Sequence, residues 1–398
     1  MSEFQGVDFF KLDDLLSPED LAVRERARKW VSERFMPVVQ QHWRAATFPF
    51  ELIPEVGQLG GLGGNIQGYG CAGLTPLQYG LVMQELERGD SGLRTLASVQ
   101  GALAMNTIYL FGSEEQKQRW LPPLARGEKL TCFGLTEPEH GSDPGGMETT
   151  AVKTATGYRL NGGKIWIGNA HQSDVAVIWA KVDGEPGVDP KSTAAIRGFL
   201  VEKGTPGFIT EVLEGKFSMR IASTCRITFR DCEIPASALL PTAKGLRAAL
   251  QALNHARFGI AWGVLGAAMG CYEEARDYAL RREQFGRPIA SFQLVQRKLS
   301  LMLTEITKAQ LLAFRLAQLK AAGTATHVHI SMAKRNNVAI ALQIARTARE
   351  ILGGIGILDE FQSFRHMCNL ESVYTYEGTD DMHLLILGEY ITGRSAFA

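Results

Sequence analysis

A single carboxylate lies beside a glycine in the stretch YTYEGTDD, residues 374–381, between one apolar helical pattern and another, MHLLILGEYITG. Carboxylates are among the side chains that general acid–base catalysis uses. Most acidic residues in loops are, however, solvated surface groups with no chemical role. Glu377 is therefore a candidate for chemistry only if the rest of the chain indicates a site around it.

Arg94 is a second candidate, because it follows Asp90-Ser91-Gly92, a pattern typical of a helix start. A cation in the first turn of a helix opposes the helix dipole and costs about 0.3–1 kcal/mol. This placement favours a compensating anion near Arg94. An ordinary surface arginine is the alternative, and the spacing by itself leaves both open.

Two further patterns suggest binding sites but lack the setting that such sites need. GYGCAG, residues 68–73, matches the GxGxxG pattern of dinucleotide sites, but no β-branched strand precedes it, and Asp90 closes a helix. A compact glycine loop is the simpler interpretation. His327 and His329 form an HxH pair without the acids or cysteines of a metal site, and none of the six cysteines forms a CxxC pair. We expect reduced cysteines, no metal ion and no dinucleotide fold.

The composition limits the class of protein. The chain has 398 residues, of which 45% are hydrophobic, and Lys+Arg and Asp+Glu number 42 each. This length corresponds to about two to three domains, and a net charge of zero argues against nucleic acid as the main partner. No apolar run of about 18 residues predicts a membrane-spanning helix. The first residues, MSEFQGVDFFKLDD, carry acids and no apolar core of a signal peptide, which predicts a cytoplasmic protein of bacterial type.

Three regions of different periodicity predict an α+β fold. Residues 1–128 have the pattern of an N-terminal all-α domain, with helix starts at Ser17-Pro18 and Thr75-Pro76. Residues 129–240 contain strands without intervening helices, including a hairpin about Asn161-Gly162, and predict an antiparallel β domain. Residues 241–398 contain long amphipathic patterns with short links, which predict a four-helix bundle whose fourth helix follows Glu377.

Four motifs, widely separated in the sequence, occur in a fixed order along the second and third of these regions. They are FGLTEPEHGSD at 133–143, KIWIGN at 164–169, REQFG at 282–286 and YEGT at 376–379. Together and in this order they resemble the acyl-CoA dehydrogenase flavoproteins, over nearly the whole chain. The stretches ELERGDSGLRTLASVQ and ALNHARFGIAWGVLGA are most similar to the glutaryl-CoA dehydrogenase branch of that family. The resemblance implies an N-terminal helical domain, a middle antiparallel β-barrel, a C-terminal four-helix bundle, FAD as cofactor and an acyl-CoA as substrate.

In that family the glutamate of YEGT is the general base. The resemblance thus implies that Glu377 removes the α-proton of the thioester while the flavin accepts a hydride from the β-carbon. Gly378 would let the backbone approach the substrate closely, and burial would raise the pKa of Glu377 toward working pH. Some relatives carry the base just before the arginine of the first bundle helix, but here that position is Ala256, before Arg257. Tyr376, beside the base, is expected to shape a later step.

The resemblance also implies the flavin site. The residues expected to contact the isoalloxazine ring and the pyrophosphate are Leu135, Thr136, Gly141, Ser142, Trp166 and Gly168. Those expected to reach the FAD of a neighbouring subunit are Arg282, Gln284, Phe285, Gly353 and Gly354. Thr379 and Asp381 resemble positions near the adenosine half. Contacts across subunits imply at least a dimer, and the organisation of the family implies a homotetramer.

For the substrate, the resemblance implies a dicarboxylic acyl-CoA. In glutaryl-CoA dehydrogenases the arginine that matches Arg94 binds the distal carboxylate, and Glu87 lies close to it. The other residues expected at the substrate are Thr95, Ser142 and Arg257. The implied reaction is the oxidation of glutaryl-CoA followed by loss of CO2 to give crotonyl-CoA, with an electron-transfer flavoprotein as electron acceptor.

Three positions depart from the glutaryl-CoA dehydrogenase pattern. Thr95 stands where serine is usual, Gly168 where threonine is usual, and Ile355 where asparagine is usual. Without a threonine hydroxyl near flavin N5, the stretch WIGN resembles the short-chain acyl-CoA oxidases of plants. Three alternatives therefore stay open: a short-chain acyl-CoA oxidase, a non-decarboxylating dehydrogenase of a related dicarboxylic acyl-CoA, and a helical scaffold that no longer turns over.

Overall fold

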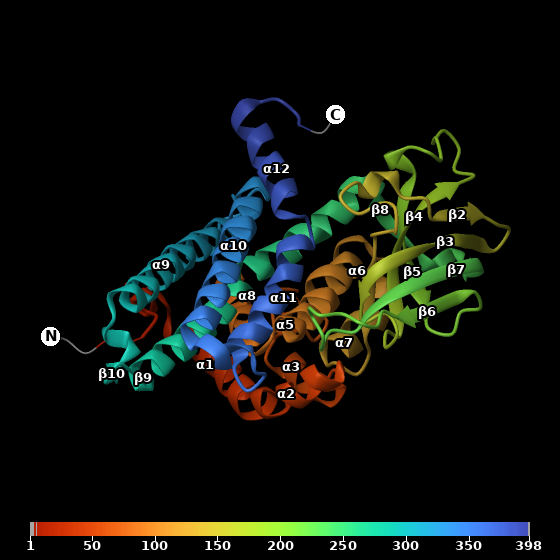
Figure 1. Cartoon of the computed structure of the whole chain (residues 1–398). Helices are drawn as coiled ribbons and strands as arrows, with labels where there is room; N and C mark the ends of the chain where they lie inside the picture. The colour runs from red at the N-terminus through yellow and green to blue at the C-terminus, as the bar shows by residue number, and fades with distance from the viewer. Residues whose placement is uncertain (1–3, 5, 397–398) are drawn as a thin grey trace.

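The computed structural model describes residues 4 and 6–396, in which helices, then a sheet, then helices follow each other along the chain (Figure 1). The N-terminal helices are α1 Pro18–Trp30, α2 Met36–Ala45, α3 Ile53–Gln58, α4 Pro76–Gly89, α5 Ser91–Ala97, α6 Asn106–Phe111 and α7 Glu114–Ala125. Wider helical segments, Val31–Phe35 and Ser98–Met105, join α1 to α2 and α5 to α6. The predicted starts of α1 and α4 are confirmed, since Ser17 and Thr75 cap them with their side chains.

The middle region forms one eight-stranded sheet. Its strands are β1 Thr131–Gly134, β2 Thr150–Lys153, β3 Gly157–Gly168, β4 Val175–Asp183, β5 Ile196–Glu202, β6 Phe208–Val212, β7 Thr224–Pro235 and β8 Leu239–Lys244. The order is β6-β7-β3-β2-β4-β5-β8, with β1 beside β4. The expected β domain is confirmed, but its strictly antiparallel pairing is wrong, because β1 and β2 both run parallel to β4. The reason is that β2 lies between β3 and β4, so β4, which reverses direction after β3, runs parallel to β2. In the described chain the path of paired strands ends at β6 and β8, so the sheet is open rather than a closed barrel.

The hairpin predicted about Asn161-Gly162 is also wrong. Both residues lie inside the single strand β3, where the register with β7 jumps between Leu160 and Gly162. Gly162 has φ 131° and supplies a β-bulge there instead of a turn. A glycine at this position suits both a hairpin turn and a β-bulge, and the strands that are available for pairing decide which of the two forms.

The C-terminal region contains α8 Gly245–Arg281, α9 Gln293–Ala321, α10 His327–Leu352, α11 Gln362–Thr375 and α12 Asp380–Thr392, with a small ribbon of β9 Glu283–Gln284 and β10 Arg287–Pro288 after α8. The expected four-helix bundle is confirmed, but its fourth member is α11, which precedes Glu377 and packs on α8 and α10. The helix after Glu377, α12, packs on α10 and projects from the body of the molecule (Figure 1).

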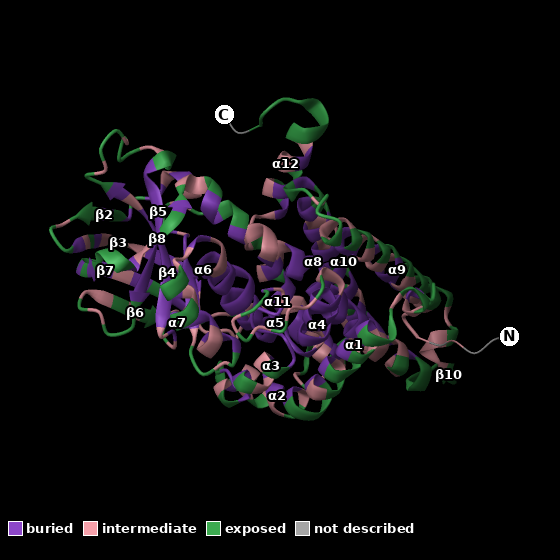
Figure 2. Ribbon diagram, turned by 180° about the vertical axis from the view of Figure 1, so that it is seen from behind, coloured by how far each residue is buried: buried purple, intermediate pink, exposed green. Residues whose placement is uncertain are grey.

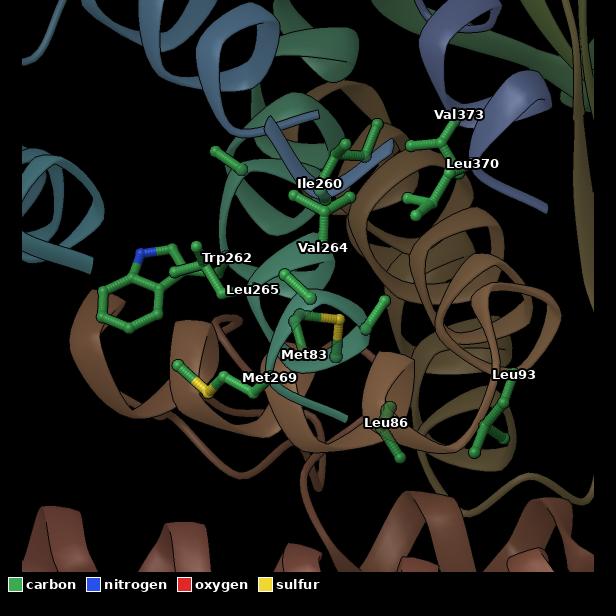
Figure 3. Close-up of a cluster of buried hydrophobic side chains, with 14 of the residues drawn as sticks. Met83, Leu86, Leu93, Ile260, Trp262, Val264, Leu265, Met269, Leu370 and Val373 are labelled. Carbon is green, nitrogen blue, oxygen red and sulfur yellow. The ribbon is translucent and has the colours of Figure 1, made fainter. Parts of the chain in front are cut away.

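The long helix α8 belongs to two hydrophobic cores. Its first third contributes Ala248, Ala249, Ala252 and Ala256 to the core that includes the β domain. From Phe258 onward it contributes to the core of the helical domains, together with residues of α4, α5 and α11 (Figure 3). Buried residues are concentrated along α4, α8 and α10 (Figure 2). Arg257 thus lies where the two cores meet.

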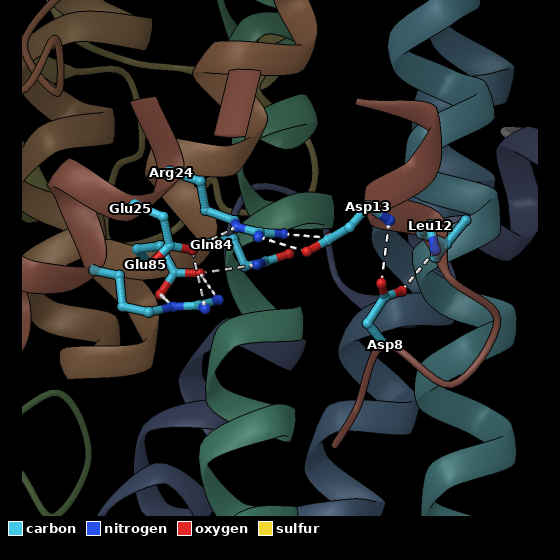
Figure 4. A network of polar contacts seen from close by, with 8 residues as sticks. Asp8, Leu12, Asp13, Arg24, Glu25, Gln84 and Glu85 are labelled. Atoms are coloured by element: carbon cyan, nitrogen blue, oxygen red, sulfur yellow. Dashed lines mark hydrogen bonds and ion pairs between the residues drawn. The ribbon is translucent and has the colours of Figure 1, made fainter. Parts of the chain in front are cut away.

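A polar network fastens α1 to α4 (Figure 4). Arg28 donates to both carboxylate oxygens of the buried Glu85, at 3.1 and 2.9 Å, and Gln84 donates to the same carboxylate at 3.0 Å. Arg24 donates to Asp13 from two nitrogens, at 2.5 and 2.7 Å. This network holds α4 in place two residues before Glu87.

Two further features concern the residues that the structure describes. No helix among them is both long and apolar enough to cross a membrane. In the same part of the chain no group of three or more His, Cys, Asp or Glu side chains is arranged to hold a metal ion.

Candidate active site

Glu377 lies in the connection between α11 and α12, which is conformationally strained. Glu377 has φ 55° and Gly378 has φ 97°, both in the left-handed region. For a residue with a side chain this conformation costs about 1–2 kcal/mol. Thr379 then caps α12, accepting a hydrogen bond from the backbone N–H of Met382 at 3.1 Å. The surrounding helices must therefore stabilise the connection, which we call the base loop (residues 376–378).

Two cations hold the backbone of the base loop. Arg257 donates from Nε to the carbonyl oxygen of Glu377 at 2.7 Å. Lys334 donates from Nζ to the carbonyl oxygens of Tyr376 and Gly378, at 3.1 and 2.9 Å. Arg257 was predicted from the sequence, as a substrate-binding residue, and that role stays a prediction. Lys334 was missed, because one lysine within a long helical pattern carries no signal of its own.

The carboxylate of Glu377 has an unusual environment. Although the residue as a whole is partly exposed, its Oε2 is buried and has no hydrogen-bond partner among the described residues. Burial raises the pKa of Glu377 to about 7, while the charges of Arg94, Arg257 and Lys334 act in the opposite direction. A pKa near the working pH is what a general base requires.

Arg94 lies in the interior, so its interpretation as a surface arginine is wrong. It forms an ion pair with Glu87, Nε to Oε2 at 2.7 Å, in which both side chains are 0% exposed. Arg94 also donates from Nη2 to the hydroxyl of Tyr376, which lies 3.1 Å from Thr95 Oγ1. In the described chain the other terminal nitrogen, Nη1, and the Glu87 Oε1 are buried without a partner. The predicted residues Glu87, Arg94, Thr95, Tyr376 and Glu377 are thus brought together.

The backbone of α8 approaches this ion pair directly at Gly263, which sequence reasoning missed. A Cβ atom at this position would lie 2.2 Å from Glu87 Oε2 and 3.2 Å from Arg94 Cδ. Glycine in a helix interior costs about 1 kcal/mol relative to alanine, so its presence calls for a packing reason. That cost was the available signal, but the reason is visible only in the structure.

Asp90 joins the helix that carries Arg94 to α11. Its carboxylate accepts the N–H of Gly92 at 2.7 Å and a hydrogen bond from Asn369 of α11 at 2.9 Å. Arg365, also on α11, lies 3.1 Å from the same carboxylate. The start of α5 is therefore held against the helix that ends at the base loop.

The residues predicted on the ring side of a flavin form a second group. Leu135 and Thr136 follow β1, and the N–H of Ile165 donates to the Thr136 carbonyl at 2.9 Å. Next to them, Trp166 is 63% exposed and has φ 62°, where the register of β3 with β7 shifts. A tryptophan so exposed at a bulge presents an apolar face on which a planar ring can pack.

Gly168 and a buried ion pair complete this second group. A Cβ atom at Gly168 would contact only Val99, at 3.3 Å, and Val99 lies one helical turn after Thr95. Lys164 is buried and donates to the Leu135 carbonyl at 3.2 Å and to Glu137 at 2.6 Å. The wide helical segment Ser98–Met105 thus connects this second group to α5, the helix that carries Arg94.

Other predicted residues lie apart from these two groups. Arg282, Gln284 and Phe285 are exposed around β9 and β10. They follow the end of α8 at Arg281, which lies about 36 Å along the helix from Arg257, since an α-helix rises about 1.5 Å per residue. The exposed residues at other places are Gly141 and Ser142 after β1, Gly353 and Gly354 at the end of α10, and Asp381 in α12. Arg282, Gln284 and Phe285 cannot reach Glu377 of their own chain, which agrees with a role in a neighbouring subunit; that role stays a prediction.

Comparison with known proteins accounts for nearly the whole chain. Models of the N-terminal, middle and C-terminal domains of acyl-CoA dehydrogenases match residues 17–128, 132–232 and 243–392. A crystal structure of a glutaryl-CoA dehydrogenase from Mycobacterium smegmatis in complex with FADH2 is 45% identical, with a TM-score of 0.96 and 100% coverage of both chains. An acyl-CoA dehydrogenase of Bacillus subtilis is 34% identical and covers 95% of this chain and 99% of its own. The human mitochondrial short-chain specific acyl-CoA dehydrogenase is 34% identical, covering 92% and 88%. The chain belongs to the acyl-CoA dehydrogenase family.

Proposed function

We propose that this acyl-CoA dehydrogenase oxidises glutaryl-CoA and then releases CO2 to give crotonyl-CoA. The observation that carries the substrate class is the buried Arg94 beside the base loop, whose Nη1 has no partner in the described chain. Leaving a buried donor unpaired costs about 1–3 kcal/mol, and more for a charged group. A substrate carboxylate removes that cost, since a guanidinium binds carboxylates at two points. An acyl chain without a distal carboxylate does not.

The cofactor is FAD, as in the acyl-CoA dehydrogenase family. The residues of this chain fit the group, because the exposed Trp166 and the side-chain-free Gly168 offer an apolar face next to Thr136. When bound, the flavin accepts a hydride from the β-carbon of the acyl chain.

Glu377 removes the α-proton in this proposal. Its Oε2 has no hydrogen bond to give up within the described chain, and burial raises the pKa to about 7, which makes it a stronger base than an exposed glutamate. Arg94 and the Tyr376 hydroxyl hold the far end of the acyl chain, while Arg257 and Lys334 fix the base loop. When the far end of the acyl chain and the base loop are both held, the α-carbon is aligned with the Glu377 carboxylate, and such alignment lowers the barrier to proton transfer.

The same residues support the second step. Loss of CO2 from the oxidised chain leaves an electron pair that is delocalised into the thioester, and a proton must then return to the chain. Glu377, protonated in the first step, is the acid that can return it. Burial raises the pKa of Tyr376 to about 12, so its hydroxyl keeps its proton and serves as a hydrogen-bond donor.

We also propose an electron-transfer flavoprotein as the electron acceptor and a homotetramer as the assembly. Support for an assembly comes from the REQFG segment, whose residues lie exposed far from the site of their own chain.

Anaerobic mixing with a panel of thioesters tests the proposal. Purified protein should be yellow, and glutaryl-CoA should bleach it faster than butyryl-CoA and yield crotonyl-CoA by mass spectrometry. Faster bleaching by butyryl-CoA would refute the substrate class, and an unsaturated dicarboxylic product would refute the decarboxylation. Colourless protein would indicate the scaffold alternative. The variant Glu377→Gln should keep the flavin spectrum and lose bleaching; a retained rate would remove Glu377 as the base.

One observation favours a second candidate, a short-chain acyl-CoA oxidase. At Gly168 no side chain occupies the space where glutaryl-CoA dehydrogenases usually carry a threonine, and a Cβ atom there would meet only Val99. Such space can admit oxygen close to the ring. Peroxide formation during turnover without an added electron acceptor would support the oxidase.

A further inference from the structure

Lys334 of α10 holds the two carbonyl groups on either side of the proposed base. Its side chain is 1% exposed, and its Nζ donates to the oxygens of Tyr376 at 3.1 Å and of Gly378 at 2.9 Å. Arg257 of α8 donates to the carbonyl of Glu377 between them, at 2.7 Å. Three consecutive carbonyl groups of the base loop therefore accept hydrogen bonds from two cations on two different helices.

The segment of α10 around Lys334 is well anchored. One turn later, the buried Asn337 donates to the carbonyl of Ala261 in α8 at 2.8 Å and to that of Ala309 in α9 at 3.3 Å. Next to Lys334, Arg335 forms an ion pair with Asp380, the first residue of α12, at 3.0 Å. Lys334 thus lies on a helix that is hydrogen-bonded to α8 and α9, and α10 also contacts the helix that follows the base loop.

The base loop needs such a donor. Its two left-handed residues, Glu377 and Gly378, turn their carbonyl groups out of the hydrogen-bond ladders of α11 and α12. Backbone oxygens outside a hydrogen-bond ladder need another partner. A neutral, shorter side chain at position 334 would leave two of them unpaired, and the carboxylate they carry would lose its fixed direction.

We propose that Lys334 is a positioning residue for the catalytic base, which fixes residues 376–378 and, through its charge, favours the ionised form of the Glu377 carboxylate. The proposal rests on the proposed role of Glu377 as the base. It assigns no contact between Lys334 and the substrate or the flavin.

Charged and titratable groups act on Lys334 from the base loop and from three helices. They are Glu377 of the base loop, Arg257 of α8, Arg94 of α5, and Asp380 and His383 of α12. Burial lowers the pKa of Lys334 to about 7, and the carboxylate of Glu377 opposes that shift. Because the charge of Lys334 lowers the pKa of Glu377, removing it should raise that pKa further. The rate needs ionised Glu377, so the low-pH limb of the rate profile should move to higher pH.

Three substitutions separate the hydrogen bonds from the charge: Lys334→Gln keeps a donor without charge, Lys334→Met removes both, and Lys334→Arg keeps both. The reductive half-reaction is followed over pH with the best thioester of the panel, whichever it proves to be. In the Gln and Met variants we expect the pH at which the rate falls to move to higher pH. The rate at the high-pH plateau should be about 10²-fold lower in Lys334→Met and less reduced in Lys334→Gln. Lys334→Arg should largely restore both the pH dependence and the plateau rate. Crystal structures should show the left-handed φ of Glu377 kept in Arg and lost in Met.

Lys320→Met is the control, since Lys320 is another lysine of the bundle whose pKa burial lowers, although its side chain is only partly buried. It should leave the limb and the plateau unchanged. The proposal is overturned if Lys334→Gln keeps the native pH dependence at low pH. It is also overturned if Lys334→Met keeps the native plateau rate and the native conformation of the base loop. If Met does not fold, the Gln and Arg profiles still decide. If Glu377→Gln also keeps its rate, the proposed base has failed, whereas an inactive Glu377→Gln beside native-like Lys334 variants refutes this inference alone.

Discussion

Replacing Gly263 with alanine introduces a methyl group where α8 packs on the Glu87–Arg94 ion pair. The new Cβ would lie 2.2 Å from Glu87 Oε2, and contacts under 3.0 Å are essentially never seen for real Cβ atoms. The carboxylate must therefore move by about 0.8 Å or more, or the helices must separate. Arg94 follows the carboxylate, because its Nε is bound to the same oxygen at 2.7 Å.

The same helix provides a matched control at Gly259. A Cβ there would meet Met83 and Tyr79 at 3.5 Å, an ordinary contact. Both substitutions gain about 1 kcal/mol of helix propensity, whereas only Gly263→Ala adds an overpacking cost of about 1–3 kcal/mol. The difference in unfolding free energy between the two variants therefore isolates the contact at position 263, and Gly259→Ala should be the more stable.

Activity provides the second readout. A displacement of about 1 Å in a group that positions substrate can cost about 10²-fold in rate. We expect Gly263→Ala to lower kcat/KM for glutaryl-CoA by about that factor, with a much smaller change for butyryl-CoA, which has no distal carboxylate. Stopped-flow bleaching with both thioesters, and denaturant unfolding of both variants, make the measurement. If Gly263→Ala matches Gly259→Ala in stability and in its preference between the thioesters, the proposed dependence of Arg94 on this glycine is refuted.

Three further predictions follow from the same site. Arg94→Lys should lower kcat/KM for glutaryl-CoA by about 10–100-fold, because a lysine cannot contact Glu87 and a substrate carboxylate at the same time, and a hydrogen bond to a charged group is worth about 1.5–3 kcal/mol. If the ratio of kcat/KM for glutaryl-CoA to that for butyryl-CoA stays unchanged, the assignment of Arg94 to the distal carboxylate is contradicted. Because burial raises the pKa of Glu377 to about 7 and only the ionised form accepts a proton, the rate of flavin bleaching should fall as pH drops through about 7; a profile flat down to pH 5 would show that the base is not this group. Gly168→Thr should be accommodated, since a Cβ there meets only Val99 at 3.3 Å, and it should reduce peroxide formation in air; unchanged peroxide would show that the missing hydroxyl does not control oxygen access.

Local signals predicted the start of elements well. Ser17 and Thr75 cap α1 and α4 as their side chains and the following prolines indicated, because capping involves residues only three positions apart. Proline inside a helical pattern is a local signal for a helix end, but Pro37 does not end the helix here. The chain instead continues through the wider helical segment Val31–Phe35 into α2, since proline is tolerated in a first turn.

The sheet shows where local signals stop being sufficient. Asn161-Gly162 is a turn signal, but β3 passes through it as a bulge because β7 is available as a partner along its whole length. Parallel pairing of β1 and β2 with β4 likewise depends on which strands become neighbours, and no local pattern records that choice.

The sequence by itself determined which side chains are candidates for chemistry, because Glu377, Tyr376 and Arg94 stand in motifs that resemble one family. Only the tertiary structure decided how they work together. The hydrogen bond from Arg94 to Tyr376 joins residues far apart in the chain, as does the bond from Lys334 to the base loop. Gly263 matters only because α8 happens to pack against Glu87. Such contacts depend on packing between helices, and residue types within one segment do not encode them.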